Sequence, residues 1–227
     1  MDTVMAMSMI VVFGAGGRAG RAVVDEALSR GHRVTAAVRD TAKYPDLETE
    51  GVILVRADVT DAASIAEAAR GADAVVHAVS PFSGPEQGFD TLDPAFFVKA
   101  ADALLAGLTV AKVGRLLVIG LFATMPDRSG GLIMDDPAAF PPEIKPFARA
   151  HADGFDRLNA AGTPLDWLML TPPANLSLDL PRTGSYRLTT EPYMEDGQLS
   201  YADLAVAIVD EIERPAHHRI RVPVYSH

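Results

Sequence analysis

Residues 9–20 read Met9-Ile-Val-Val-Phe-Gly-Ala-Gly-Gly-Arg-Ala-Gly20, an apolar run followed by a turn that is dense in glycine. The β-branched and aromatic residues at 10–13 are typical of a buried strand. Apolar residues then recur at helical spacing over 21–28, and Gly31 stands where a helix cap belongs. This stretch therefore predicts a strand, a tight turn and a helix.

The glycine turn has the chemistry of a phosphate site. A helix N-terminus presents unpaired N–H groups and the positive end of the helix dipole. A pyrophosphate can reach them only where no Cβ intervenes. We expect Gly14 to form the tight turn, Gly17 to let a ligand approach, and Gly20 to let the helix pack on the strand. Gly16 belongs to the same predicted dinucleotide site. The strict Gly-x-Gly-x-x-Gly spacing fails at Ala19, and a glycine cluster alone could form an ordinary strand-to-helix turn. The strand before the turn, the helix after it and the strand that follows favour dinucleotide binding.

Composition narrows the class of protein. With 227 residues, 48% of them hydrophobic, the chain can bury a substantial core in one α/β domain. No apolar run reaches the ~18 residues of a membrane span, and the absence of cysteine excludes thiolate metal sites and a cysteine nucleophile. The net charge of −10 argues against nucleic-acid binding. The first nine residues contain no Lys or Arg, so we expect no signal peptide and a cytoplasmic location.

Strand and helix patterns alternate along the chain to about residue 171. The predicted strands are 32–38, 52–57, 74–79, 115–120 and 165–170, and the predicted helices are 61–70, 93–106 and 142–161. This alternation predicts an α/β fold with a Rossmann-type doubly wound parallel sheet. Residues 1–175 are expected to form the NAD(P)-binding domain. Residues 176–227 are expected to form a small C-terminal cap that completes the same domain, with an extended arm at 184–190, a helix at 201–212 and a strand at 219–225.

The end of the second predicted strand bears on the choice of cofactor. In this fold an acidic residue there binds the ribose 2′-hydroxyl of NAD, and a basic residue accommodates the 2′-phosphate of NADP. Arg39 stands at this position, with Asp40 next to it, and Arg18 lies in the glycine turn. Two guanidinium groups favour NADP(H), and NAD(H) is the alternative.

Three other positions leave alternatives open. Asp58, at the end of the third predicted strand, could bind the adenine amino group or cap the turn. His77 lies within an apolar strand and is predicted to be a packed core residue. The irregular stretch 121–139 has the length of a lid. Asp135-Asp136 within it could bind a metal, but a solvated acidic turn is the favoured interpretation, and no metal site is predicted.

The whole chain resembles the atypical short-chain dehydrogenases/reductases, in particular the NmrA-like NAD(P)H-binding group that includes NADH-flavin reductases. The matching motifs are Gly14-Ala-Gly-Gly-Arg-Ala-Gly20, Ala37-Val-Arg-Asp40, Ala57-Asp-Val-Thr-Asp61, Leu165-Asp-Trp-Leu-Met-Leu-Thr-Pro-Pro173 and Ser200-Tyr-Ala-Asp-Leu-Ala205. By position, the resemblance implies that the turn residues and Arg39 hold the phosphates. It also implies that the adenine and nicotinamide ends lie against Asp58, Val59, Ala78, Val79, Ser80, Pro172 and Ala174.

The chain departs from that superfamily at its Tyr-x-x-x-Lys pair. Counting back from the strand at 165–170 places the pair at Phe147-x-x-x-His151. Phenylalanine cannot donate a proton, so the resemblance implies hydride transfer from NADPH to a flat conjugated acceptor such as flavin, which orientation and water exclusion can drive. His151 is the candidate proton donor, because a histidine pKa lies near neutrality. A surface histidine is the alternative.

Two further interpretations of the function stay open. NmrA-like proteins include non-catalytic NAD(P) redox sensors that bind partner proteins, and the missing pair suits that role. A specialised biosynthetic reductase or isomerase would act on one small-molecule metabolite instead. In each case we expect no nucleic acid, no membrane partner and a monomer or homodimer.

Overall fold

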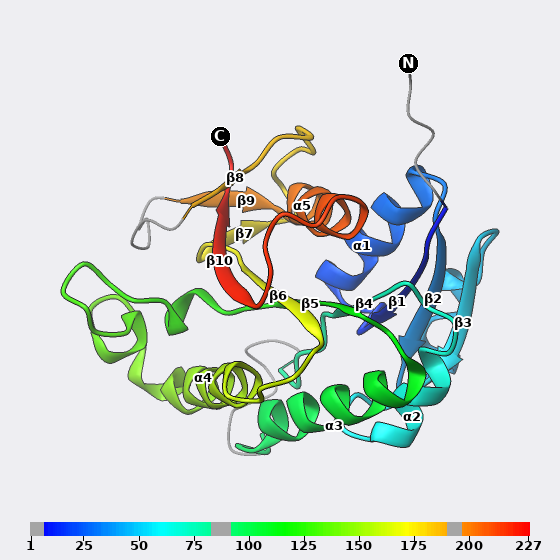
Figure 1. Ribbon diagram of the computed structural model, residues 1–227. Coiled ribbons are helices and arrows are strands. Elements are labelled where there is room, and N and C mark those ends of the chain that lie inside the picture. Colours follow the sequence, from blue (N-terminus) through cyan, green and yellow to red (C-terminus); the bar gives the residue numbers. More distant parts are fainter. Residues whose placement is uncertain (1–6, 83–91, 190–196) are drawn as a thin grey trace.

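The computed structural model describes residues 7–82, 92–189 and 197–227. Its main sheet contains eight strands in the order β3-β2-β1-β4-β5-β6-β10-β8, all parallel except β8 (Figure 1). The strands are β1 (Met9–Phe13), β2 (Arg33–Val38), β3 (Val52–Arg56), β4 (Ala74–His77), β5 (Arg115–Ile119), β6 (Asp166–Thr171), β8 (Arg187–Leu188) and β10 (Ile220–Tyr225). This order confirms the predicted Rossmann-type fold.

Helices cover both faces of the sheet. Helices α1 and α5 pack together on one face, and α2, α3 and α4 pack side by side on the other (Figure 1). Their bounds are α1 (Arg18–Ser29), α2 (Ala62–Ala68), α3 (Phe96–Ala111), α4 (Lys145–Asn159) and α5 (Tyr201–Glu213). Alternate residues of each strand enter opposite cores, as in β1, where Ile10 and Val12 face α1 and Val11 and Phe13 face α3. Both faces are therefore buried, which explains the continuous apolar strands.

Two predicted helices have shifted bounds. Asp93 and Pro94 form a turn, in which the Asp93 carboxylate accepts a hydrogen bond from the Ala95 N–H at 2.9 Å, so α3 begins only at Phe96. It continues past the predicted end to Ala111, where Lys112 takes a left-handed conformation with φ of 61°. Helix α4 follows a 3-10 turn at Pro142–Ile144, and the stretch 121–139 contains two further short 3-10 turns.

The residues from 176 onward join the main fold. Strand β10 extends the parallel sheet beside β6, and β8 pairs antiparallel with β10. The arm predicted at 184–190 therefore contributes β8 to the main sheet. Strands β7 (Asn175–Ser177) and β9 (Gln198–Ser200) form a separate two-stranded sheet. The division of the chain at residue 175 stays a prediction.

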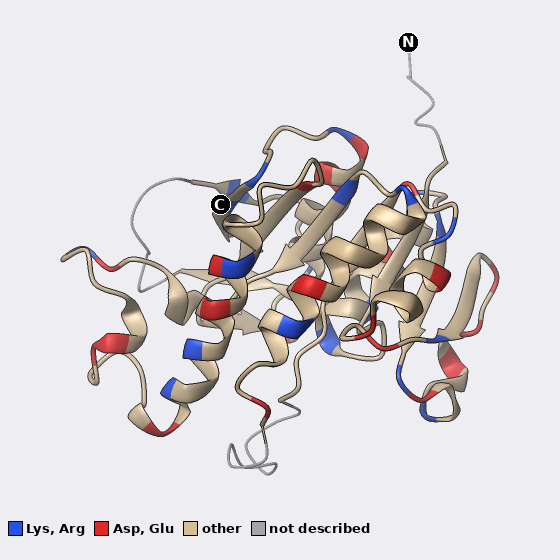
Figure 2. Ribbon diagram, turned by 60° about the horizontal axis from the view of Figure 1, so that its bottom comes forward, with Lys and Arg blue, Asp and Glu red and all other residues tan. Residues whose placement is uncertain are grey.

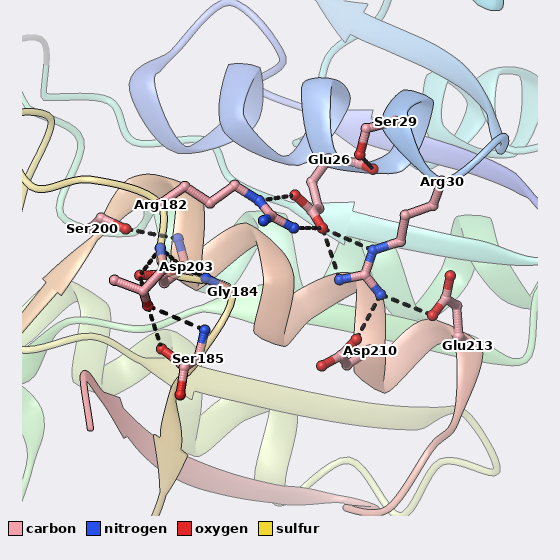
Figure 3. Close-up of polar contacts among 11 residues, drawn as sticks. Glu26, Ser29, Arg30, Arg182, Gly184, Ser185, Ser200, Asp203, Asp210 and Glu213 are labelled. Atoms are coloured by element: carbon pink, nitrogen blue, oxygen red, sulfur yellow. Dashed lines mark hydrogen bonds and ion pairs between the residues drawn. The ribbon is translucent and has the colours of Figure 1, made fainter.

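Ion pairs around the buried Glu26 carboxylate tie this C-terminal part to α1 (Figure 3). Glu26 is 5% exposed and accepts hydrogen bonds at 2.9 Å from Arg182 and at 2.8 Å from Arg30. Arg30 also pairs with Asp210 at 2.6 Å and with Glu213 at 2.9 Å. Burial alone would raise the pKa of the Glu26 carboxyl, but its two arginine partners outweigh burial and lower it. The network fixes α5 against α1.

A second buried carboxylate holds the segment that precedes β8. Asp203 is 1% exposed and accepts hydrogen bonds from the N–H groups of Thr183 and Gly184 at 2.9 and 2.8 Å. Asp203 lies in the first turn of α5, and the Ser200 side chain caps this helix by accepting a hydrogen bond from the Asp203 N–H at 2.9 Å. The Ser-x-x-Asp pattern that predicted the start of α5 therefore also anchors a loop.

The order of the strands reverses between β1 and β4, which makes this point the topological switch of the sheet. Acidic and basic residues are spread over the helices and loops of the fold (Figure 2). Within residues 7–82, 92–189 and 197–227, no group of three or more His, Asp or Glu side chains could hold a metal ion. In the same ranges no helix is long and apolar enough to cross a membrane.

Candidate nucleotide and acceptor site

The glycine turn follows β1 at the topological switch. Gly14 has φ of +85°, and a Cβ there would lie 2.7 Å from the carbonyl oxygen of Ala78, so this position requires glycine. The Gly17 N–H donates to the carbonyl of Gly14 at 3.0 Å and closes the turn. Helix α1 then begins at Arg18, with the N-cap residue Gly17 offering no side-chain cap. The first N–H groups of the helix are therefore open to a ligand.

Gly20 and Gly17 differ in what surrounds them. A Cβ on Gly20 would lie 2.1 Å from the carbonyl oxygen of Gly14, so this glycine lets α1 pack on the turn. A Cβ on Gly17 would approach nothing in the chain closer than 3.4 Å, and the residue is exposed. The fold therefore requires glycine at position 20, while the open side of Gly17 suits the close approach of a ligand.

Arg18 and Arg39 are both exposed at this edge of the sheet. Arg18 lies over the ring of Tyr201, 5.5 Å from its centroid. Among the residues that the structure describes, neither guanidinium has a carboxylate within 4 Å, although other Arg and Lys side chains form ion pairs. Both cations are therefore available to an anionic ligand.

The nearby carboxylates Asp40 and Asp58 have local partners. Asp40 accepts a hydrogen bond from the Ala42 N–H at 3.2 Å, and Asp58 accepts from the N–H of Thr60 at 2.9 Å. The Thr60 N–H lowers the pKa of the Asp58 carboxyl, and the positive charge of Arg39 lowers it further. Asp58 therefore caps its turn, one of its two predicted roles, and Arg39 lies near it where β2 and β3 end.

The other predicted nucleotide contacts follow strands of the same sheet. Val59 is 4% exposed and packs in the core on the α3 face of the sheet. Ala78 and Val79 are half-buried after β4, and Ser80 is exposed. Pro172 is buried and Ala174 is exposed after β6. Because all of these strands are parallel, the structure brings the predicted residues to one edge of the sheet.

Aromatic side chains gather beside this edge, on the face covered by α3 and α4. Phe97 of α3 contacts Phe147 of α4, with ring centroids 5.9 Å apart, and Phe82 contacts Phe147 at 5.6 Å. The imidazole of His151 lies against Phe97 at a centroid distance of 3.6 Å. We call Phe82, Phe97, Phe147 and His151 the aromatic wall.

His77 and His151 line a cavity of about 30 Å³ behind the aromatic wall. His77 is 6% exposed, and its Nδ1 has no hydrogen-bond partner among the described residues. Burial lowers the pKa of His77 to about 4. Burial and the neighbouring His77 lower the pKa of His151 to about 3. The expectation of a His151 pKa near neutrality was therefore wrong, because burial away from water disfavours the charged form. Its catalytic role stays a prediction.

The buried His77 should make stability fall in weak acid. Its pKa in the fold, about 4, lies below the ordinary value of 6.5, so the unfolded chain binds more protons between these values. We expect the wild type to lose about 2 kcal/mol more than His77→Leu between pH 7.5 and pH 5. Urea unfolding at both pH values measures this difference, and equal losses in the two proteins would contradict it.

A family model for NAD(P)H-binding proteins matches residues 14–215. The chain belongs to this NAD(P)H-binding family. The match runs from the first glycine of the turn past the end of α5, so it includes the glycine turn and most of the C-terminal part of the chain. The predicted resemblance to the NAD(P)H-binding atypical reductases is confirmed.

Relatives of this NAD(P)H-binding protein span nearly its full length. The uncharacterised protein YwnB of Bacillus subtilis (strain 168) is 33% identical over 223 residues, which cover 96% of this chain and 98% of YwnB. A candidate epimerase from Bacteroides thetaiotaomicron has 29% identity and a TM-score of 0.83, covering 97% and 98% of the two chains. A candidate NADH-flavin reductase from Streptococcus pneumoniae TIGR4 has 28% identity and a TM-score of 0.79, covering 97% and 100%.

Sequence reasoning missed three aromatic residues at the site. Phe97 lies in an apolar helical pattern and gives no signal of its position at the sheet edge. Tyr201 was noted only as the start of a helix, although it lies beneath Arg18. Tyr44 follows the predicted cofactor-selecting Arg39 by five residues, and that spacing is the one signal that could have drawn attention to it.

Proposed function

We propose that this NAD(P)H-binding protein is an NADPH-dependent reductase that transfers hydride to a flat conjugated acceptor such as flavin. The observation that carries the proposal is the aromatic wall, which lies beside the carboxyl edge of the sheet where the nucleotide turn opens. Aromatic rings can orient a flat acceptor by stacking. Such a site needs orientation and water exclusion more than a strong acid.

The residues at the turn fit a dinucleotide. The open side of Gly17 and the free N–H groups of α1 would hold the pyrophosphate, and Arg18 would balance its charge. The backbone after β4 and β6, at Ala78 and Ala174, would line the nicotinamide end. When bound, the reduced nicotinamide supplies the hydride from its C4 atom.

The arrangement of charges supports NADP(H) over NAD(H). Arg39 is exposed, without an ion pair among the described residues, at the position that would contact the 2′ substituent. Asp40 could otherwise accept a hydrogen bond from a 2′-hydroxyl. Its carboxylate instead accepts a hydrogen bond from the Ala42 N–H and lies 3.8 Å from the ammonium group of Lys43. The free guanidinium therefore favours a 2′-phosphate.

Phe147 and His151 would act on the acceptor. Phe147 stands where the resemblance places the catalytic tyrosine and offers a stacking surface in place of a hydroxyl. His151 is uncharged at neutral pH because its pKa is about 3. It would therefore hold the acceptor through a neutral ring N–H or nitrogen lone pair, and the proton for the reduced acceptor would come from water.

The relatives agree with this proposal at the level of the family. The Streptococcus pneumoniae structure, a candidate NADH-flavin reductase, matches nearly the whole chain. The candidate epimerase matches it equally well in length, so the fold alone does not select the acceptor. Location in the cytoplasm and a state of monomer or homodimer stay predictions.

Absorbance at 340 nm with NADPH and FMN tests the proposal. We expect the wild type to oxidise NADPH when FMN is present. Phe147→Ala should lower kcat/KM for FMN about tenfold through lost stacking while the Kd for NADPH stays unchanged. Phe140→Ala, which removes a buried ring from another core cluster, formed by residues between 121 and 152, is the matched control for general destabilisation.

The alternatives predict different outcomes of that assay. Tight NADPH binding without turnover of flavins, quinones or tetrapyrroles would contradict the proposal and favour a redox sensor. Turnover with one unrelated metabolite only would favour a biosynthetic reductase or isomerase. Loss of NADPH binding in Phe147→Ala would show that the ring stabilises the nucleotide site and does not act by stacking on the acceptor.

A further inference from the structure

Tyr44 occupies the space beside Gly16 in the nucleotide turn. A Cβ built on Gly16 would lie 2.4 Å from both Cε1 and Cζ of the Tyr44 ring. No real Cβ tolerates such a distance, so the ring rests directly on the Gly16 backbone. The absence of a side chain at position 16 thus makes room for a residue of the chain itself, in contrast to the open side of Gly17.

Further contacts hold Tyr44 in this place. Arg21 of α1 donates from Nε to the Gly16 carbonyl at 3.3 Å and pairs through its guanidinium with Asp46 at 2.6 Å. The same guanidinium lies 5.8 Å from the centroid of the Tyr44 ring. We call Gly16, Arg21, Tyr44 and Asp46 the Tyr44 clasp. It joins helix α1, the nucleotide turn and the segment after β2.

The inner side of the clasp is anchored in the core. Tyr44 lies between two 3-10 turns, Thr41–Lys43 and Pro45–Leu47. Leu47 is 6% exposed, and both Tyr44 and Leu47 pack against the core on the α1 face. The segment that begins at Arg39 is therefore held at both ends, by β2 before it and by the clasp after it.

This anchoring determines where Arg39 lies relative to the turn. The side chain of Arg39 has no ion-pair partner among the described residues, so its position depends on its backbone. That backbone runs from the end of β2 into the segment that the clasp ties to Gly16. A long cation gains most from a phosphate when its backbone is fixed in advance, because less conformational freedom is lost on binding.

We propose that Tyr44 is a positioning residue that confers selectivity for the 2′-phosphate of NADPH by fixing the Arg39 segment on the nucleotide turn through Gly16. The inference rests on the proposed preference for NADPH. It adds a determinant of selectivity that does not itself carry the charge. The pair formed by Gly16 and Tyr44 acts as one unit, since either a larger residue at 16 or a smaller one at 44 breaks the same contact.

A double-mutant cycle with NADPH and NADH as probes tests the inference. We expect Tyr44→Ala to weaken NADPH binding about tenfold, with NADH binding changed less than about twofold. Gly16→Ala alters the nucleotide turn itself, so both affinities should fall, and we expect the ratio of NADPH to NADH affinity to fall about as far as in Tyr44→Ala. The double variant should lower this ratio no further than either single one, because the contact is already lost. Tyr44→Phe should retain the wild-type ratio of the two affinities, since the ring carries the contact.

Circular dichroism and thermal unfolding of each variant separate loss of the fold from loss of selectivity. If Tyr44→Ala does not fold, the comparison of Gly16→Ala with the wild type carries the test, because that variant keeps the tyrosine. An unchanged ratio of NADPH to NADH affinities in both single variants would overturn the inference alone. Additive losses in the double variant would overturn it as well. A wild type that binds neither nucleotide would overturn it together with the proposed function.

Discussion

Arg39→Asp is expected to reverse the nucleotide preference of this protein. The substitution removes the exposed guanidinium at the end of β2 and places a carboxylate where the 2′ substituent would lie. A charge-assisted hydrogen bond contributes about 1.5–3 kcal/mol, and repulsion adds to its loss, so NADPH should bind roughly 100-fold more weakly. NADH should bind as well or better, because a carboxylate can accept from the 2′-hydroxyl. Fluorescence titration with both nucleotides measures the two dissociation constants.

Arg33→Asp is the matched control for this experiment. Arg33 is also exposed and lies at the other end of the same strand, so the change of net charge is identical. We expect the ratio of the two affinities to stay at its wild-type value. Equal effects of the two substitutions on the affinities would show that only the net charge of the protein matters. An unchanged ratio of NADPH to NADH affinity in Arg39→Asp would show that Arg39 does not contact the 2′ substituent.

Gly20→Ala should destabilise the fold by about 2–4 kcal/mol, because the new Cβ would overlap the carbonyl of Gly14. In an unhindered helix interior the same change would stabilise by about 1 kcal/mol, so even the sign of the effect is diagnostic. The new Cβ would lie 2.1 Å from that oxygen and 2.7 Å from its carbon. These are backbone atoms, so α1 must move away from the turn. Urea unfolding measures the loss, and NADPH affinity should fall with it.

Gly114→Ala provides the control for this prediction. A Cβ at Gly114 would meet nothing within 4 Å, and the residue is exposed between α3 and β5. We expect the free energy of unfolding of the Gly114→Ala variant to stay within about 0.5 kcal/mol of the wild-type value. If Gly20→Ala were equally harmless, the close packing of α1 on the turn would not be the reason for the glycine at that position.

The glycine turn illustrates how far local patterns reach. The β-branched run before it and the helical spacing after it predicted β1, α1 and the role of Gly20, because these features depend on neighbours in the chain. The parallel order of the sheet followed from the alternation of strands and helices. Arg39 could be proposed as a reader of the 2′ substituent because its position at a strand end is itself a local feature.

The protonation of the histidines could not be predicted in this way. From the sequence alone, His151 is expected to have an ordinary pKa. The burial that lowers this pKa arises because α3, α4 and β4 bring Phe97 and His77 next to His151. The same reason hides the contact of Tyr44 with Gly16, since those residues lie 28 positions apart and meet only through the fold. Hydrophobic patterns mark a residue as buried, but they do not identify its neighbour across the core.

The sequence by itself determined the strand-turn-helix unit, the order of alternating elements and the absence of cysteine chemistry, and it predicted basic residues beside the proposed phosphate site. These follow from backbone preferences and short-range spacing. Only the tertiary structure decided that residues after 176 extend the main sheet and that Asp40 and Asp58 accept hydrogen bonds from nearby backbone N–H groups. It also decided that the aromatic wall lies beside the carboxyl edge of the sheet. Those features arise where segments distant in sequence are packed together, and packing depends on the shape of the whole chain.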